Sequence, residues 1–316
     1  HDNFGEDLII NDRDGGVFYW DKSDGTGVRA KNLADDLSIG TRTSVPTIAT
    51  KIIMSDRDRH VIAFGCDGLG TSSATGGDTV QNPLLIRFSS QENPVDWFPS
   101  TVNTAGDLQI STGSKIVTAI ETRQQILVFT DVSLHSLQFL GPPFTFGLSM
   151  LSNNLTIASP LAVVAVEDTV FWMGQEEFYS YAGSVQRLPC TVRDFVFTDF
   201  NFLQKEKVTA STNTAFGEVW WFYPSANSQE NDKYVVFNYQ QNLWYYGDMA
   251  RTVWMDRGIN ADPLAAGTDH YLYAQESGFD DGSTEPASAI TAFIESSQVD
   301  IGDGDHFLFM SKMIPD

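Results

Sequence analysis

The residues of this 316-residue sequence that could do chemistry are mainly aspartates in short, glycine-containing turns. The segment DKSDGTG (21–27) spaces side-chain oxygens as a calcium loop does, but it lacks the downstream bidentate glutamate that completes such a loop. Tight hairpins between strands require the same residue types, so hairpin turns are the favoured interpretation and bound cations the alternative. The other turns of this kind are NDRDGG (11–16), SDRDRH (55–60), DDGS (280–283) and GDGDH (302–306).

The histidines do not form a recognisable catalytic set. A nucleophile–histidine–acid triad needs a histidine placed to take a proton, and none of the five lies in a nucleophile motif. His135 and His270 fall in strand-like runs, where we expect half-exposed strand positions. The Gly/Ser-rich segment GLGTSSATGG (68–77) lacks the lysine of a phosphate-binding loop, and it is typical of a surface loop. We therefore predict no enzymatic activity, no catalytic residues and no cofactor or metal site. The remaining histidines are His1, His60 and His306.

Two cysteines, Cys66 and Cys190, lie far apart with no CxxC spacing and no nearby pair of histidines. This pattern predicts reduced thiols, neither a disulfide framework nor a zinc site. The longest apolar runs, such as ASPLAVVAV (158–166), are much too short to span a bilayer, so no membrane insertion is expected. Because the sequence begins at His1 and stops after SKMIPD, we interpret it as a piece of a longer polypeptide.

Short apolar runs that alternate with polar residues, such as KIVTAIET and QQILVFTD, predict strands. They recur along the chain between Gly, Asp, Asn, Ser and Pro. One helix is expected over 191–207, where Val192, Phe195, Val196 and Phe200 fall at helical spacing and Thr191 with Asp194 forms a weak capping box.

A repeat of strand, turn, strand, turn, aromatic strand and glycine runs through the chain. It is clear in 115–141 and 160–183, and it returns in 207–247 with an inserted loop, SANSQEN (225–231). Partial copies are 8–21, 50–65 with 82–90, and 252–275, and the closing glycines are Gly141, Gly183 and Gly247.

Units of about 40 to 50 residues with about four strands predict the blades of a β-propeller. The fold class is therefore all-β, with about five to six antiparallel blades and one short helix. Each blade is a small sheet that must bury its faces against its neighbours, which explains the many aromatic residues. Trp220, Trp221, Phe222, Tyr245 and Tyr246 are interpreted as this filling, and an aromatic platform for sugars is the alternative.

We place the propeller at 1–285. Residues 286–316 contain the end of a Gly/Ser/Pro/Asp linker (279–289) and two further predicted strands, which either close the propeller or begin an additional β domain.

The charge is strongly acidic, since 19 basic residues stand against 41 acidic ones, for a net charge of −22. Such an acidic surface disfavours stable binding of nucleic acid through basic residues. It is compatible with the wall of a channel through which DNA passes without binding. The simpler interpretation is that the charge maintains solubility.

Several segments resemble the tail nozzle and packaged-DNA stabilisation proteins of short-tailed bacteriophages. The resemblance covers nearly the whole chain. It consists of similar sequence segments in the same order and includes no catalytic motif. Its segments are DNFGEDLIINDRDGGVFYWD (2–21), AVEDTVFWMGQEEFYSYAGSVQRLPCTVRDFVF (165–197), EVWWFYPSANSQENDKYVVFNYQQNLWYYG (218–247) and TAFIESSQVDIGDGDHFLFMSKMIPD (291–316).

This resemblance implies a β-propeller with an additional β domain and a structural role in the virion. Members of the family form a homo-oligomeric ring below the portal and adaptor, extend the channel through which DNA leaves, and help to retain packaged DNA. It implies contact with other tail proteins, transient contact with DNA, and assembly in the bacterial cytoplasm. On length and polarity, loops 65–82 and 224–232 are the candidates to face the channel.

The alternative function is a carbohydrate-binding or glycan-hydrolysing propeller, since some propellers hydrolyse glycosides with paired carboxylates. Acidic residues are plentiful enough for chance pairs, but the repeated Asp boxes and arginine triad of sialidase-like propellers are not visible.

Overall fold

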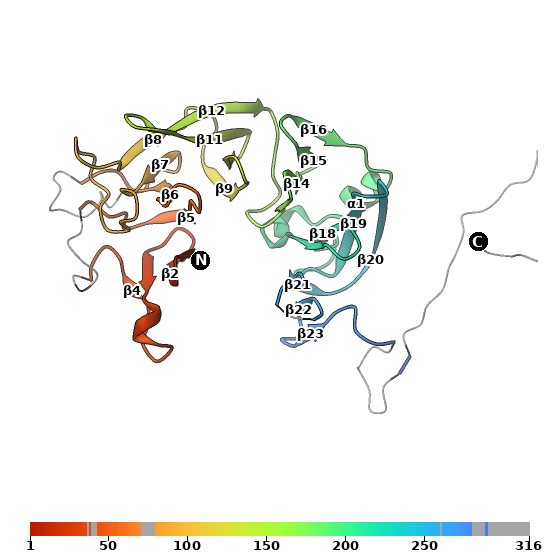
Figure 1. Cartoon of the computed structure of the whole chain (residues 1–316). Coiled ribbons are helices and arrows are strands. Elements are labelled where there is room, and N and C mark those ends of the chain that lie inside the picture. The colour runs from red at the N-terminus through yellow and green to blue at the C-terminus, as the bar shows by residue number, and fades with distance from the viewer. Residues whose placement is uncertain (37, 39–42, 71–79, 260, 280–287, 290–316) are drawn as a thin grey trace, which may run out of the picture. The chain divides into compact units, whose positions relative to one another are not determined.

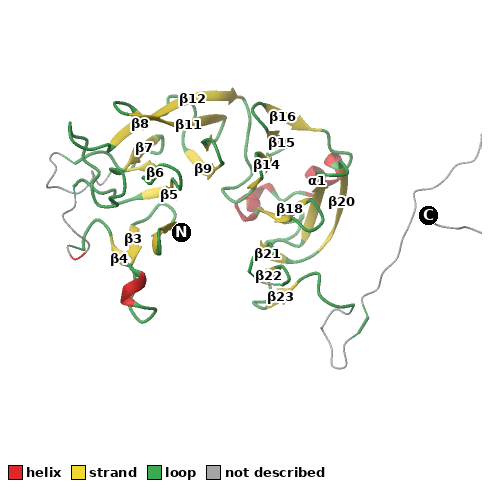
Figure 2. Ribbon diagram, in the orientation of Figure 1, coloured by secondary structure: helices red, strands yellow, loops and turns green. Residues whose placement is uncertain are grey.

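The computed structural model describes residues 1–36, 38, 43–70, 80–259, 261–279 and 288–289. Its strands form six antiparallel sheets that follow one another along the chain (Figure 1). Helices are only short segments beside them (Figure 2). The predicted all-β propeller is thus confirmed, with six blades. By internal contacts the chain divides into residues 1–275 and 276–316. Apart from 288–289, the predicted terminal strands lie outside the described residues.

Five blades have four strands each in the described residues, and the sixth has three. Blades one to three contain β1 (Asp2–Phe4), β2 (Asp7–Asn11), β3 (Val17–Trp20), β4 (Lys31–Asn32); β5 (Ala49–Met54), β6 (Val61–Cys66), β7 (Leu85–Phe88), β8 (Gly106–Gln109); and β9 (Ile116–Glu121), β10 (Ile126–Thr130), β11 (Ser133–Gly141), β12 (Thr145–Asn153). Blades four to six contain β13 (Val163–Val166), β14 (Thr169–Met173), β15 (Phe178–Tyr181), β16 (Val185–Leu188); β17 (Thr209–Asn213), β18 (Glu218–Tyr223), β19 (Lys233–Asn238), β20 (Leu243–Asp248); and β21 (Arg251–Met255), β22 (Leu264–Gly267), β23 (Leu272–Ala274).

Within each blade the strands are hydrogen-bonded in chain order. The first strands of neighbouring blades also meet, as β5 with β9, β9 with β13, β13 with β17, and β17 with β21. These first strands therefore lie at the inner edges of the blades and line the propeller axis.

The core consists of clusters of buried side chains between successive blades. The largest cluster joins blades three, four and five and includes Trp172 and Trp221. A separate cluster joins blades five and six and includes Trp220, Phe222 and Trp254. Neighbouring residues of β18 thus fill opposite interfaces, because successive side chains of a strand point to opposite faces of the sheet.

The repeat is confirmed in its strands, but its closing glycines are not equivalent. Gly141 ends β11 and Gly183 lies in the turn after β15, each at the end of a third strand and each with a positive φ. Gly247 instead lies within β20, the fourth strand of its blade. The interval of 183–247 is longer than that of 141–183 because it also includes α1, η3, the inserted loop and the fourth strand β20.

The helix predicted over 191–207 is confirmed only for its first part, and it does not continue to residue 207. The structure has α1 (Arg193–Asp199) followed by the 3₁₀ segment η3 (Phe202–Lys207), with Phe200 extended between them. Phe200 forms a β-bridge with Ser225, and the Asn201 side chain caps η3 by accepting from Leu203 N. The predicted capping box is absent as well, because Val192 occupies the N-cap and makes no side-chain cap bond.

Candidate functional site

The inner strands border a half-open pocket of about 260 Å³. Its walls come from β2 and its following turn, from β5 and β9, from residues 160–161 before β13, and from η3. Asn11 ties two of these walls together, because its side-chain amide donates to the carbonyl oxygen of Ala49 at 3.0 Å. The fold thus brings residues far apart in sequence to one axial pocket.

Three charged side chains lie in this axial pocket. The Arg13 guanidinium pairs with the Glu206 carboxylate at 3.3 Å, linking the first blade to η3. Burial lowers the pKa of Lys51, and the Asp2 carboxylate opposes that shift. The pocket can hold a small polar group, and the Thr50 hydroxyl in its lining donates to the Asp14 carboxylate at 2.6 Å. The sequence did not single out this pocket.

A second group of charges lies at the turn between β5 and β6. Asp2 accepts a hydrogen bond from Met54 N at 2.8 Å, and Glu121 accepts one from Asp56 N at 3.3 Å. Carboxylates from the first and third blades therefore meet the second blade. Burial and the neighbouring Asp56 carboxylate raise the pKa of Glu121 to about 7. The turn was singled out from the sequence, but Glu121 was missed because its partners are non-local.

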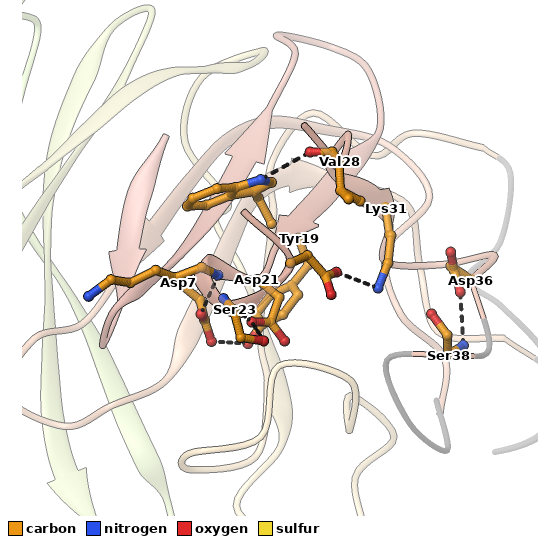
Figure 3. A network of polar contacts seen from close by, with 11 residues as sticks. Asp7, Tyr19, Asp21, Ser23, Val28, Lys31, Asp36 and Ser38 are labelled. Carbon is orange, nitrogen blue, oxygen red and sulfur yellow. Dashed lines mark hydrogen bonds and ion pairs between the residues drawn. The ribbon is translucent and has the colours of Figure 1, made fainter. Parts of the chain in front are cut away.

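The Asp-rich turn 21–27 is held by its own hydrogen bonds (Figure 3). Asp21 accepts from the backbone N and the hydroxyl of Ser23, which lowers the pKa of Asp21. Asp24 pairs with Lys31 at 2.8 Å, and Asp7 accepts from Lys22 N at 3.0 Å. The aspartates therefore serve as turn and strand-end acceptors.

No group of three or more His, Cys, Asp or Glu side chains in the described residues is placed to hold a metal ion. Of the other acidic turns, 11–16 and 55–60 connect β2 with β3 and β5 with β6. The turns 280–283 and 302–306 lie outside the described residues, as does His306.

The half-exposed strand positions predicted for two histidines are wrong. His135 is buried in β11, where its ring lies 3.0 Å from the Ser133 hydroxyl. His270 is exposed in the turn between β22 and β23, with a φ of 72°. His60 is fully buried against Phe88 and Phe146, and burial lowers its pKa. These residues lie in different blades and form no catalytic set.

Both cysteines are free thiols. Cys66 is buried, and burial raises its pKa to about 12. Cys190 is half-buried, and burial raises its pKa to about 11. Neither thiol has the lowered pKa of a reactive nucleophile.

The aromatic filling is confirmed for three of the five predicted residues. Trp220, Trp221 and Phe222 are buried, but Tyr245 and Tyr246 are exposed because β20 is the outer strand of its blade. Tyr246 stacks on exposed Phe195 of α1, with ring centroids 4.1 Å apart.

This stacked pair lies beside an open pocket of about 420 Å³ whose lining includes Phe195, Asp199 and Lys233. Lys233 pairs with Asp199 at 2.8 Å. An exposed aromatic surface beside polar groups is the kind of site that stacks on sugars. It is therefore a second candidate binding site.

The inserted loop is held against η3. Asn231 is buried, and its amide donates to the carbonyl oxygen of Lys207 at 2.8 Å. Asn201 donates to the carbonyl oxygen of Ser228, also at 2.8 Å. Of the other candidate channel loop, residues 71–79 lie outside the described residues.

In the part of the chain that the structure describes, no helix combines the length and apolar character needed to cross a bilayer.

No protein-family model matches this sequence, and no curated protein matches it. Among solved structures, the AfRom2 CNH domain has a TM-score of 0.43 at 12% identity, covering 85% of this chain and 81% of that chain. Hsv2 of Kluyvelomyces marxianus has a TM-score of 0.46 at 6% identity, covering 93% of this chain and 77% of that chain. A putative 6-phosphogluconolactonase of Bacteroides fragilis has a TM-score of 0.46 at 9% identity, covering 85% of this chain and 79% of that chain. Similarities this remote carry no functional argument.

Proposed function

We propose that this chain is a structural protein of a short bacteriophage tail. It forms a homo-oligomeric ring that extends the DNA exit channel and helps to retain packaged DNA. It contacts the portal or adaptor and other tail proteins, and its contact with DNA is transient. It is assembled in the bacterial cytoplasm and resides in the virion.

The observation that carries the proposal is the net charge of −22. In the Asp-rich turn 21–27, the aspartates make hydrogen bonds and an ion pair that stabilise the fold. An acidic wall repels a duplex and lets it slide. The aromatic cores join blades into a body suited to a mechanical role. The family resemblance of the segments quoted above supports the same role.

The test uses the purified protein and short-tailed phage particles that lack this component. Wild-type protein should cosediment with these particles and be incorporated at the tail. A protein that remains free while the particles accept their other tail proteins would contradict the proposal.

The second candidate is a carbohydrate-binding propeller, favoured by the exposed Phe195–Tyr246 pair beside Asp199 and Lys233. Glycan-array binding that is lost in Phe195→Ala and kept in Leu203→Ala, an exposed residue of η3, would support it. Absence of binding to bacterial surface glycans would remove this candidate.

A further inference from the structure

The axial pocket contains a lysine that the fold leaves without an ionic partner. Lys51 lies on β5, the inner strand of the second blade, and its side chain is half-buried. Within the described residues, the Lys51 ammonium makes neither an ion pair nor a hydrogen bond, although the Asp2 carboxylate attracts it from a greater distance. Burial lowers the pKa of Lys51, because a desolvated ammonium without a close counter-charge favours its neutral form. A bound anion would supply the missing charge.

Thr118 adds a hydrogen-bonding group on the neighbouring wall. It lies on β9, next to β5, and it lines the pocket although it is only 2% exposed. Its hydroxyl has no hydrogen-bond partner in the part of the chain that the structure describes. A ligand acceptor at this position would gain a hydrogen bond that no protein group supplies.

The neighbouring charged side chains are already engaged. Arg13 pairs with Glu206 at 3.3 Å, and Asp14 accepts from the Thr50 hydroxyl at 2.6 Å. The Arg13 charge is thus balanced within the protein, which leaves Lys51 as the cation available to a ligand. Because the Glu206 and Asp14 carboxylates are near the pocket, they repel added negative charge, and an anion of single charge is favoured over a dianion.

An apolar wall completes the pocket. It consists of Ile52, Val117, Pro160 and Leu161. Ile52 and Val117 are buried, whereas Leu161 is 57% exposed. The backbone of Leu161 is nevertheless fixed, because Ala210 N donates to its carbonyl oxygen at 2.7 Å. The pocket therefore offers a ligand an apolar surface that is held in place.

We propose that the axial pocket binds a small organic carboxylate with a short apolar chain. The Lys51 ammonium pairs with the carboxylate, the Thr118 hydroxyl donates to one of its oxygens, and the apolar chain lies against Pro160 and Leu161. A volume of about 260 Å³ suits a ligand smaller than a typical drug molecule. This binding site goes beyond the proposed tail function and does not depend on it.

Calorimetric titration of the purified protein with hexanoate tests the site. We expect Lys51→Met to weaken hexanoate binding at least about ten-fold, because contacts between charged groups are the stronger ones. Thr118→Val, which is nearly isosteric, should weaken it about three-fold. The matched control is Lys115→Met, which removes the same charge from an exposed position just before β9 and outside the pocket lining. This control should leave the affinity nearly unchanged.

Two further ligands test the chemical class. Hexanamide has the same apolar chain without the charge, and inorganic phosphate has charge without the chain. Both should bind at least about ten-fold more weakly than hexanoate, because each lacks one of the two contacts. Phosphate that binds more tightly than hexanoate would overturn the assignment to carboxylates, and equal binding of hexanamide would overturn the role of Lys51.

Methyl NMR locates the bound ligand. Hexanoate should shift the methyl resonances of Leu161 in proportion to the bound fraction. Leu243 is the control, because it is 55% exposed but lies on β20, the outer strand of the fifth blade. Absence of binding at millimolar hexanoate, or binding that leaves Leu161 unshifted or is unchanged in Lys51→Met, would overturn the proposal.

Discussion

At the residue scale, Trp220 and Trp221 illustrate how one strand serves two interfaces. Trp221 is fully buried among blades four and five, and its indole N–H donates to the carbonyl oxygen of Ala162 at 3.0 Å. Trp220 stacks on Trp254 of the next blade, with centroids 5.1 Å apart. The alternation that predicts a strand therefore also assigns each tryptophan to an interface.

Replacing Trp221 with alanine should destabilise the protein by about 3–5 kcal/mol, the usual cost of removing a large buried aromatic side chain. Urea unfolding monitored by circular dichroism measures the loss. Tyr246→Ala is the control, because Tyr246 is exposed and its truncation should cost less than about 1 kcal/mol. Equal losses in the two variants would contradict the assignment of Trp221 to the core.

Glu121 should make stability depend on pH. Its pKa in the folded state is raised to about 7 from an ordinary value of 4.5, so folding favours its protonated form. The stabilisation from this proton is fully present below pH 4.5 and is lost as pH rises through 7. Glu121→Gln should thus be more stable than wild type at pH 8, by about 1 kcal/mol after allowance for solvent screening.

At pH 4 the two proteins should have nearly equal stability, which paired urea titrations at both pH values would measure. The control is Glu176→Gln in the turn between β14 and β15, where the carboxylate is exposed. If Glu121→Gln lowered stability at pH 8, the carboxylate would be a favourable ionised acceptor there, contrary to this account.

At the element scale, the inserted loop 225–231 behaves as part of the packed structure. Its anchor is Asn231, which is 2% exposed and bonded to the Lys207 carbonyl oxygen. Lys207 in turn pairs with Glu230. This polar insertion therefore connects the fifth blade to η3 through hydrogen bonds and an ion pair.

Asn231→Ala should release this loop at a cost of about 1–2 kcal/mol, because it leaves the part-buried carbonyl oxygen of Lys207 without its donor. Limited proteolysis with mass spectrometry should detect faster cleavage within 225–231. Gln229→Ala is a control in the same loop, since the Gln229 side chain is involved in an exposed contact with Gln204. Equal cleavage rates in Asn231→Ala and wild type would contradict the anchoring role.

The elements that could be predicted from the sequence are those set by local patterns. Alternation located most strands, and Gly with Asp marked their turns. The break at Phe200 could not be predicted, because it depends on a bridge to Ser225 from a distant loop. The axial pocket and the Glu121 cluster were missed for the same reason: both join residues from different blades.

At the scale of the whole molecule, the acidic charge should prevent stable DNA binding. We expect no shift of a short duplex by micromolar full-length protein at physiological salt, because cationic contacts and counterion release supply most non-specific affinity. An electrophoretic mobility assay measures this. Micromolar affinity that weakens steeply with added salt would reveal a basic surface and contradict the proposed sliding wall.

The measurement that tests the central claim most directly is the fraction of packaged DNA retained by phage particles. Particles lacking this component are supplied with the wild-type full-length protein or with buffer, and DNase-sensitive DNA is then measured over time. We predict that the wild-type protein restores retention to the level of complete particles. Continued leakage from particles that have incorporated the protein would contradict the account.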